Sequence, residues 1–435
     1  MKFKKMNILL LFIFIIFSLL NLIDSKELFE DYYKRAEEIM SDMTLNQKIG
    51  QMFIARYNNA TAGEEVANYT PAGYLLFDDN FANHTEKELI SELRNASNQL
   101  PINIPLAFGV NEEGGTVCTA SLYYREGIFP SPRESFIKGG INTILEVEKD
   151  KRELLHRLKL NYNFAPVADI SLDPGDYMYN RSLGQNSNIT SDYIKNVVDS
   201  YYENTFTCCV KHFPGYGNIT NSPDDISYDK RPLDYLKKND LVPFAKAIEH
   251  KVPMIMISHL IVEEIDKYYP SSLSKAVHDM LRNEYNYSGL IVTDSLSLGA
   301  ITKNITNVSA AVLAVLAGND LIVTYNYKEH YDDVVAAVNN NEINITLIEK
   351  AAKRVIAWKL QYIYKEQNLI FNFAFLYVFG SFILIGLIIL VSCYVVRNKK
   401  KHLNNYDDEE DNNDNFSAHG KRLISNQSDQ RDSEL

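Results

Sequence analysis

The stretch Thr205-Phe206-Thr207-Cys208-Cys209-Val210, followed at once by Lys211-His212-Phe213-Pro214-Gly215, holds the pattern that decides the fold. Its first part is a short, mostly apolar run without polar alternation, which is typical of a strand buried on both faces. Its second part brings an ammonium group and an imidazole directly after that strand. Polar groups at the carboxyl end of a parallel strand indicate a ligand site.

Runs of the same kind recur along the chain between Lys26 and Lys365, and helical stretches separate them. The further runs are residues 73–77, 104–110, 164–170, 252–257, 289–293 and 321–324. The helical stretches are residues 86–100, 144–160, 191–204, 233–250, 276–284, 309–317 and 346–361. Strands that alternate with helices predict a parallel α/β fold, and this pattern leaves a closed barrel and a doubly wound sheet both open.

Polar residues also follow two other predicted strands. Asn111-Glu112-Glu113-Gly114-Gly115 comes after 104–110, and Asp294-Ser295 comes after 289–293. Each group also has a purely structural interpretation. An aspartate after a strand is often a helix cap, and Lys211 with His212 could be a hydrogen-bonded polar pair in the core. Arg181 alone could be a surface charge. Together these groups indicate a pocket for a polyhydroxylated ligand.

Six segments of the chain resemble, in the same order, the motifs of glycoside hydrolase family 3. They are 41–52 (the family's first helix), 111–115 (D-x-E-G-G), 163–170 (N-F-A-P-V-x-D), 180–182 (R-S), 211–217 (K-H-F-P-G-H-G) and 293–298 (S-D-x-L-S-M). One such match would be weak, whereas collinear matches across the chain are strong. The chain looks most similar to the family's bacterial β-N-acetylglucosaminidases that have a single domain.

The resemblance implies a (β/α)8 TIM-like barrel over residues 26–365 and a retaining glycosidase that uses no cofactor and no metal. Such an enzyme needs a carboxylate nucleophile and a proton donor. Asp294 matches the nucleophile of the family. Arg181, Lys211 and His212 match residues that hydrogen-bond sugar hydroxyls, and Asn111 occupies the position of an aspartate that grips the sugar.

The proton donor is where the chain departs from the family. The related acetylglucosaminidases use a histidine in an Asp-x-His pair on the loop after K-H-F-P-G-H-G, but here Ser222 and Asp224 occupy these positions. Tyr216 replaces the second histidine of the strand motif, and Thr116 stands where an arginine is common. Asp224 or Asp225 could serve as acid/base if burial raised its pKa.

Two hypotheses follow from these matches and departures. The first is a membrane-anchored retaining exo-glycosidase that removes terminal β-linked sugars, of the β-N-acetylhexosaminidase or β-glucosidase type. The second is a catalytically impaired barrel that serves as a cell-surface carbohydrate-binding receptor. The retained Asp294 and its polar neighbours favour the enzyme.

The two ends of the chain predict targeting segments. Lys2, Lys4 and Lys5 precede the apolar run 8–20, which is the pattern of a cleaved signal peptide over 1–25. An uncleaved signal anchor is the alternative interpretation of the same pattern. Residues 373–396 contain no charged side chain and precede a basic cluster, so we expect a transmembrane helix there. With 366–372 as juxtamembrane segment and 397–435 as disordered cytosolic tail, the expected protein is single-pass, type I, with its barrel extracellular or lumenal.

Composition adds three expectations. The net charge of −12 argues against a nucleic-acid partner and leaves a carbohydrate as the expected partner. Four cysteines are too few for a disulfide framework, so buried free thiols are favoured over a bridge from Cys118 to Cys208 or Cys209. Glycosylation of a secreted chain is expected at N-x-[ST] sequons, among them Asn59, Asn68, Asn83, Asn95, Asn188, Asn286, Asn304, Asn307 and Asn344.

Overall fold

The computed structural model describes residues 27–220 and 224–364, together with Ser392. The chain divides into two units, Met1–Glu366 and Gln367–Leu435, and the fold below is that of the first. The expected signal peptide, the juxtamembrane segment and the cytosolic tail lie outside the described residues. The expected barrel domain lies within them.

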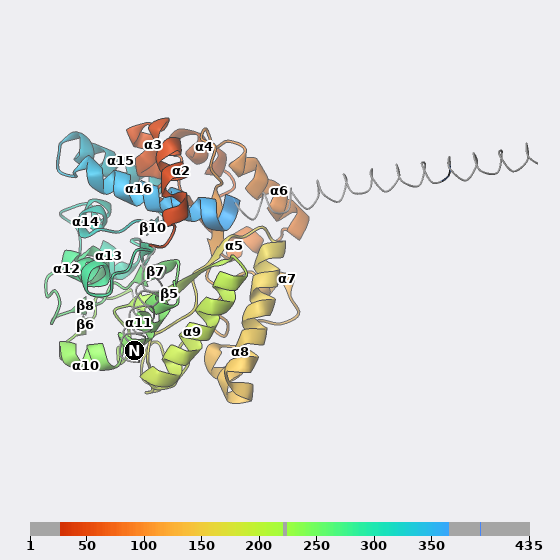
Figure 1. Ribbon diagram of the computed structural model, residues 1–435, viewed down its shortest axis with the longest axis vertical. Coiled ribbons are helices and arrows are strands. Elements are labelled where there is room, and N and C mark those ends of the chain that lie inside the picture. Colours follow the sequence, from red (N-terminus) through yellow and green to blue (C-terminus); the bar gives the residue numbers. More distant parts are fainter. Residues whose placement is uncertain (1–26, 221–223, 365–391, 393–435) are drawn as a thin grey trace, which may run out of the picture. The chain divides into compact units, whose positions relative to one another are not determined.

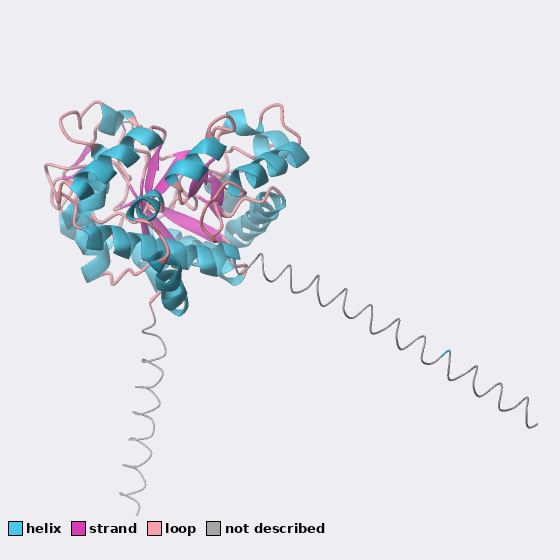
Figure 2. Ribbon diagram, turned by 90° about the horizontal axis from the view of Figure 1, so that it is seen from above, coloured by secondary structure: helices cyan, strands magenta, loops and turns pink. Residues whose placement is uncertain are grey.

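Eight parallel strands form the centre of this unit, in the order β10-β1-β2-β3-β4-β5-β7-β9. Figure 2 shows strands in the middle with helices around them. Their bounds are β1 Phe53–Arg56, β2 Gly73–Leu75, β3 Ala107–Val110, β4 Tyr162–Asn163, β5 Thr207–Phe213, β7 Met254–Ile257, β9 Leu290–Thr293 and β10 Ile322–Thr324. A parallel bridge between Val292 and Leu321 joins the two outermost strands. The sheet is therefore a nearly closed, TIM-like barrel, and the alternative of an open doubly wound sheet does not apply. A second, two-stranded sheet pairs β6 Tyr228–Asp229 with β8 Ile261–Val262.

Helices surround these strands (Figure 1). In the first half of the chain they are α2 Glu30–Ser41, α3 Leu45–Gly50, α4 Ala62–Tyr69, α5 Asp78–Phe81, α6 Glu86–Ser97, α7 Ser121–Tyr124, α8 Pro132–Arg157 and α9 Ser187–Glu203. In the second half they are α10 Leu233–Lys238, α11 Val242–Glu249, η1 Ser271–Leu273, α12 Lys275–Asp279, η2 Met280–Glu284, α13 Gly299–Thr302, α14 Ala310–Ala317, α15 Tyr327–Asn339, α16 Ile345–Lys359 and η3 Leu360–Tyr364. Thr44, Thr85 and Ser131 begin α3, α6 and α8 with capping boxes, which satisfy backbone N–H groups that a helix start leaves open.

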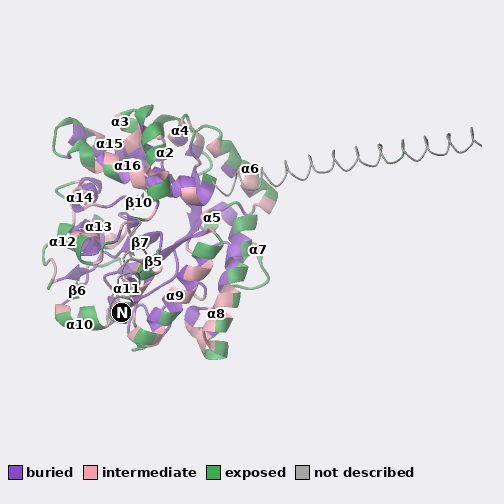
Figure 3. Ribbon diagram, in the orientation of Figure 1, coloured by how far each residue is buried: buried purple, intermediate pink, exposed green. Residues whose placement is uncertain are grey.

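The strands are buried on both faces, as Figure 3 shows for the centre of the barrel. Because successive side chains of a strand point to opposite faces, each strand contributes to two apolar layers. In β9, Leu290 and Val292 belong to the inner cluster and Ile291 to the outer one. The inner cluster fills the barrel, and the outer cluster joins the strands to the helices.

The carboxyl end of α16 closes the barrel where the strands begin. The indole of Trp358 is fully buried and donates from Nε1 to Oγ1 of Thr207, the first residue of β5, at 2.9 Å. The next residue, Lys359, donates from Nζ to Oε1 of Gln51, which lies just before β1, at 2.9 Å. Two adjacent residues of one helix thus fasten the starts of two strands.

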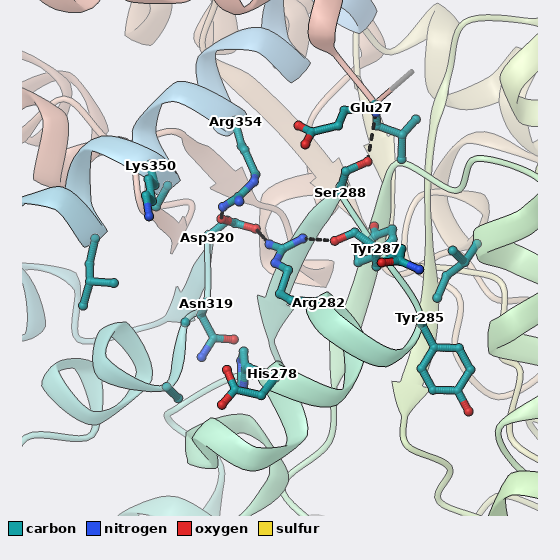
Figure 4. Close-up of a pocket in the computed structure, with 18 of the residues that line it drawn as sticks. Glu27, His278, Arg282, Tyr285, Tyr287, Ser288, Asn319, Asp320, Lys350 and Arg354 are labelled. Carbon is teal, nitrogen blue, oxygen red and sulfur yellow. Dashed lines mark hydrogen bonds and ion pairs between the residues drawn. The ribbon is translucent and has the colours of Figure 1, made fainter. Parts of the chain in front are cut away.

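A large pocket lies at this same end of the strands, with a volume of about 910 Å³ (Figure 4). The buried carboxylate of Asp320, just before β10, accepts hydrogen bonds from Arg282 at 2.5 Å and from Arg354 at 3.0 Å. Arg282 also donates to the backbone oxygen atoms of Tyr287 and Gly289 at 2.7 Å each. This network ties α16 and η2 to the starts of β9 and β10, so the pocket has a structural lining.

The structure corrects several details of the predicted elements. It adds β1, which directly follows the segment 41–52 and was not among the predicted strands. It places β4 at Tyr162–Asn163, ahead of the predicted strand 164–170. The predicted helix 233–250 is two helices, α10 and α11, with Pro243 in the first turn of the second. Helix α8 begins well before residue 144, with a kink at Gly139 and Gly140.

The three described cysteines are free thiols. Cys208 and Cys209 are buried in β5, and Cys118 is partly buried. This confirms the expectation of free thiols over a bridge from Cys118.

The expected membrane localisation needs correction. Among residues 27–220 and 224–364, with Ser392, no helix is both long and apolar enough to cross a bilayer. A single-pass type I membrane protein is therefore not supported. The run 373–396, on which that expectation rested, lies outside the described residues except for Ser392.

The buried lysine at position 359 generates a prediction about pH. Burial holds the pKa of Lys359 well below its usual value, so the folded state binds fewer protons here than the unfolded state. The stabilising contribution is fully present above the unfolded pKa of about 10.4 and is lost as the pH falls through the folded value. From pH 7 to 9.5, the unfolding free energy of wild type relative to Lys359→Met should rise by up to about 1.4 kcal/mol per pH unit.

Denaturant unfolding at several pH values measures this difference. Lys350→Met is the matched control, because Lys350 lies exposed on the same helix. The prediction fails if the wild type and Lys359→Met have parallel stability profiles over this range.

Candidate active site

The polar residues expected at the strand ends gather at the carboxyl end of the barrel. Asn111 follows β3, Lys211 and His212 lie near the end of β5, and Asp294 follows β9. Arg181 comes from the segment between β4 and α9. In a parallel barrel these strand ends meet at one mouth, which is where such folds carry their chemistry.

A buried carboxylate, Glu113, joins two of the expected sugar-binding cations. Arg181 donates to it from Nε at 2.9 Å and from Nη2 at 2.7 Å, and Nζ of Lys211 lies 2.6 Å away. Lys211 also donates to Oδ1 of Asn111 at 3.0 Å. Burial acts to raise the pKa of Glu113, but Arg181 and Lys211 hold it well below its usual range. The cluster is therefore charged and rigid.

The turn that carries Glu113 is fixed by its neighbours. The amide of Asn163 exchanges two hydrogen bonds with the backbone of Glu112, at 2.9 and 3.0 Å, which ties β4 to the end of β3. The carboxylate of Glu112 accepts the backbone N–H of Ala120 at 2.7 Å. Gly114 and Gly115 have φ values of +94° and +63°, a left-handed conformation that disfavours other residues. These contacts explain why the N-E-E-G-G sequence folds into a tight turn.

His212 is oriented by a second buried carboxylate. Nδ1 of His212 donates to Asp169 at 2.7 Å, and the same carboxylate accepts the backbone N–H of Tyr216 at 2.7 Å. With Nδ1 as donor, Nε2 of the neutral ring is an acceptor, and it lies 3.5 Å from Nη2 of Arg181. Asp169 therefore sets which ring nitrogen His212 presents to the cluster.

Asp294 is half-buried on the loop after β9. Its backbone N–H donates to the carbonyl of Ile257 at 2.9 Å, which continues the pairing with β7. Its Oδ1 accepts the backbone N–H of Ser295 at 2.7 Å. Burial raises the pKa of the nearby Tyr216 to about 12, and the carboxylates of Asp294 and Asp169 add to this effect. Because Asp294 follows β9 and His212 lies near the end of the parallel strand β5, both are at the carboxyl end of the barrel.

The expected acid/base candidates lie apart from these buried groups. Asp224 and Asp225 both have exposed side chains, on the loop that follows β5. Asp225 forms an ion pair with Lys303 at 3.0 Å, and the backbone oxygen of Asp224 accepts from the same ammonium at 2.9 Å. Neither aspartate therefore has the burial that would raise the pKa of a proton donor.

The two substituted motif positions behave differently from each other. Tyr216 is buried, and its ring meets that of Tyr177 edge-on with centroids 6.1 Å apart. With a pKa of about 12, its phenol stays protonated at neutral pH. Thr116 is exposed on the surface of its turn. Ser222 lies outside the described residues.

Sequence reasoning did not single out Glu113 and Asp169 as functional. Both occupy acidic positions of the motifs already quoted, in D-x-E-G-G and N-F-A-P-V-x-D. That position was a usable signal, but their partners are 68 and 43 residues away in the chain. Only the folded structure shows that these carboxylates organise the site.

The pocket of Figure 4 is not part of this site. Its residues Ser288 and Asp320 precede β9 and β10, so the pocket opens at the opposite end of the strands. Among residues 27–220 and 224–364, no group of three or more His, Cys, Asp or Glu side chains is arranged to hold a metal ion.

Glu113→Gln should destabilise the protein strongly. The substitution keeps the shape but removes the charge that both Arg181 and Lys211 need, and breaking a buried ion pair costs about 3–5 kcal/mol. Thermal or denaturant unfolding measures the loss. Glu126→Gln, an exposed change in the same connection, should leave stability within about 0.5 kcal/mol of wild type. Equal stability of the two variants would contradict the role of Glu113.

Comparison with known proteins shows what this chain resembles. Beta-hexosaminidase LpqI of Mycobacterium tuberculosis is 27% identical over 323 residues, covering 72% of this chain and 82% of the relative. The beta-hexosaminidase of Idiomarina loihiensis is 30% identical over 264 residues, covering 58% and 76%.

Solved structures agree with these relatives. A glycoside hydrolase family 3 beta-N-acetylglucosaminidase from Paenibacillus sp. superposes with a TM-score of 0.69 at 27% identity, covering 74% of this chain and 63% of that one. The structure of M. tuberculosis LpqI gives a TM-score of 0.67 at 25% identity, covering 74% and 96%. Residues 44–358 match the glycosyl hydrolase family 3 N-terminal domain. The chain therefore belongs to glycoside hydrolase family 3.

Proposed function

We propose that this glycoside hydrolase removes terminal β-linked sugars, with retention of configuration, and that N-acetylhexosamine is its preferred terminal sugar. The main support is that Asp294 follows β9 at the same mouth of the barrel as the charged cluster of Glu113, Arg181 and Lys211. The beta-hexosaminidases among its relatives support the choice of sugar. β-Glucosidase activity is the nearest alternative within the same mechanism.

In this mechanism Asp294 acts as the nucleophile. Its carboxylate attacks the anomeric carbon, the bond from that carbon to the leaving oxygen breaks, and an acid protonates that oxygen. A water molecule, deprotonated by the same group, then attacks the glycosyl ester and releases the sugar and Asp294. A carboxylate on a rigid strand end suits the role, because nucleophile and anomeric carbon must be held in line.

The charged cluster would bind the hydroxyl groups of the terminal sugar. Lys211 and Arg181 supply donors from buried and half-buried positions, and Nε2 of His212 can accept a hydrogen bond from a sugar hydroxyl. Hydrogen bonds from charged donors are roughly twice as strong as neutral ones. Asn111 offers an amide in place of the aspartate of related enzymes, and its Oδ1 is already engaged by Lys211.

Asp294→Ala should abolish turnover of aryl β-N-acetylglucosaminides, with a loss on the order of 10³-fold or more. The purified full-length chain is assayed with a panel of aryl β-glycosides. A 2-fluoro sugar with a good leaving group should label the peptide that contains Asp294. Azide, a small external nucleophile, should restore turnover in the variant and give the α-glycosyl azide.

Asp279→Ala is the matched control, because Asp279 is an exposed aspartate near the opposite end of the barrel. It should keep wild-type activity. Unchanged turnover in Asp294→Ala, or a label on another residue, would rule out Asp294 as the nucleophile.

The acid/base assignment has a separate test. If Asp224 or Asp225 donates the proton, replacing it with Asn should slow hydrolysis of a β-linked disaccharide by about 10²–10⁴-fold. The same variant should cleave an aryl glycoside with a good leaving group at nearly the wild-type glycosylation rate, because that leaving group needs no proton. Neither aspartate is the acid if both variants hydrolyse the disaccharide at the wild-type rate.

One observation favours a second function, a carbohydrate-binding barrel with weak catalysis. The two candidate acids are exposed, and Asp225 is paired with Lys303. A site with a nucleophile and no acid would bind sugar and cleave only activated substrates. Binding of N-acetylglucosamine without turnover of any disaccharide would favour this function.

A further inference from the structure

A polar pocket with a volume of about 480 Å³ adjoins the candidate active site. We call it the rim pocket and define it by Arg56, Glu65, Asp79, His84, Glu92 and Tyr325. Arg56 ends β1, Asp79 belongs to α5 after β2, and Tyr325 follows β10. These strands are neighbours in the barrel, so the rim pocket opens at the same mouth as Asp294.

Tyr325 lines the rim pocket and contacts the loop that carries the nucleophile. Its backbone N–H donates to Oγ of Ser297 at 3.0 Å, which fastens it to the loop that carries Asp294. Burial raises the pKa of Tyr325, and the carboxylates of Asp294 and Asp224 add to the rise. The backbone oxygen of Asp224 accepts Nζ of Lys303 at 2.9 Å, and Lys303 directly follows α13. Tyr325 and Asp224 therefore both contact the segment 294–303, which begins with the nucleophile.

The ring of Tyr325 is held in a fixed position and remains 37% exposed. Phe77 meets it edge-on, with centroids 5.3 Å apart. The guanidinium of Arg56 lies 4.7 Å from the ring centre of Phe77 and 5.5 Å from that of Tyr325. Asp79 holds Arg56 through an ion pair of 3.0 Å. An immobilised aromatic face offers the apolar C–H face of a sugar a surface to stack on.

The two carboxyl groups of a retaining glycosidase flank the bond that breaks. A group close to both therefore lies beside the leaving group as it departs. From the position of Tyr325 we infer that the rim pocket binds the leaving-group sugar, with that sugar stacked on Tyr325. This inference rests on the proposed function and adds to it the part of the substrate beyond the cleaved bond.

The charge of the rim pocket limits which sugar fits. Glu65, Glu92 and Asp79 contribute three carboxylates, while Arg56 pairs with Asp79 and His84 lies 3.3 Å from Glu92. Glu65 also lines the adjoining depression beside α15, with Glu329, Asp332 and Asp333 and with Lys328, which pairs with Asp332. A carboxylate on the leaving sugar would meet this negative potential at close range. The substrate class is therefore a disaccharide or oligosaccharide whose leaving sugar carries no acidic group.

Three substrates with the same terminal sugar test the inference on the full-length chain. They are N-acetylglucosamine linked β-1,4 to a second N-acetylglucosamine, the same sugar linked β-1,4 to glucuronic acid, and N-acetylglucosaminyl β-fluoride. Fluoride leaves without a proton and is too small to occupy the rim pocket. Its release reports the nucleophile alone.

Tyr325→Ala should lower kcat/KM for the neutral disaccharide at least tenfold and leave fluoride release unchanged. Tyr325→Phe, which keeps the ring, should stay within about threefold of wild type, since stacking needs no hydroxyl. The inference would be overturned if Tyr325→Ala lowered kcat/KM equally for the disaccharide and the glycosyl fluoride, or if it left kcat/KM for the disaccharide unchanged.

A matched pair of charge changes tests the selectivity. Wild type should cleave the neutral disaccharide at least tenfold better than the acidic one. Glu65→Gln should narrow that ratio, whereas Glu64→Gln should not, because Glu64 is an exposed neighbour on α4 outside the rim pocket. Equal cleavage of the two disaccharides by wild type would overturn the assignment. Failure to release fluoride in wild type would instead overturn the proposed function, and this inference with it.

Discussion

The carboxylate of Glu113, buried between Arg181 and Lys211, is the interaction on which the arrangement of the site depends. A charge inside a protein is tolerated only when it is paired and hydrogen-bonded. Glu113 meets that condition through partners on two other segments of the barrel mouth. The end of β5 and the segment before α9 can therefore reach their positions only together with the turn after β3.

The two ends of the barrel differ: the contacts that close it lie where the strands begin, and the candidate site lies where they end. Where the strands begin, Trp358 and Lys359 of α16 fasten β5 and β1, and Asp320 joins Arg282 to Arg354. Where the strands end, the polar groups belong to the candidate site. A packed interior joins the two ends, so the carboxyl ends can carry loops with function while the other end holds the closure.

Within the mouth, the groups differ in how firmly they are held. Lys211, His212 and Glu113 are buried and paired with partners at less than 3 Å. The side chains of the candidate acids Asp224 and Asp225 are exposed, and Asp225 pairs with Lys303 at 3.0 Å. A nucleophile must be aligned with the anomeric carbon, so a fixed position on the end of a strand favours its attack. A group that protonates a departing oxygen needs to approach only once substrate is bound, and catalytic contacts often tighten only in that complex.

The fold class and the candidate site residues could be predicted from the amino-acid sequence alone. Strands buried on both faces need continuous apolar runs, so the runs now seen in β2, β3, β5, β7, β9 and β10 were recognisable locally. Asn111, Lys211 and Asp294 were recognisable because a polar residue directly after such a run is expected at the carboxyl end of a strand, where barrels carry their ligand sites. Arg181 was recognisable from the collinear motifs, which also indicated the family.

Which of these groups contact one another became clear only from the folded chain. Glu113 and Asp169 stand in quoted motifs, but their importance comes from partners far along the chain, which no local pattern names. The strand β1 is too short, and too close to α3, to be separated by periodicity. The exposure of Asp224 and Asp225 and the place of Tyr325 beside Asp294 likewise depend on how distant loops meet. Burial and charge pairing between distant segments are properties of the folded chain, and for that reason they could be read only from its structure.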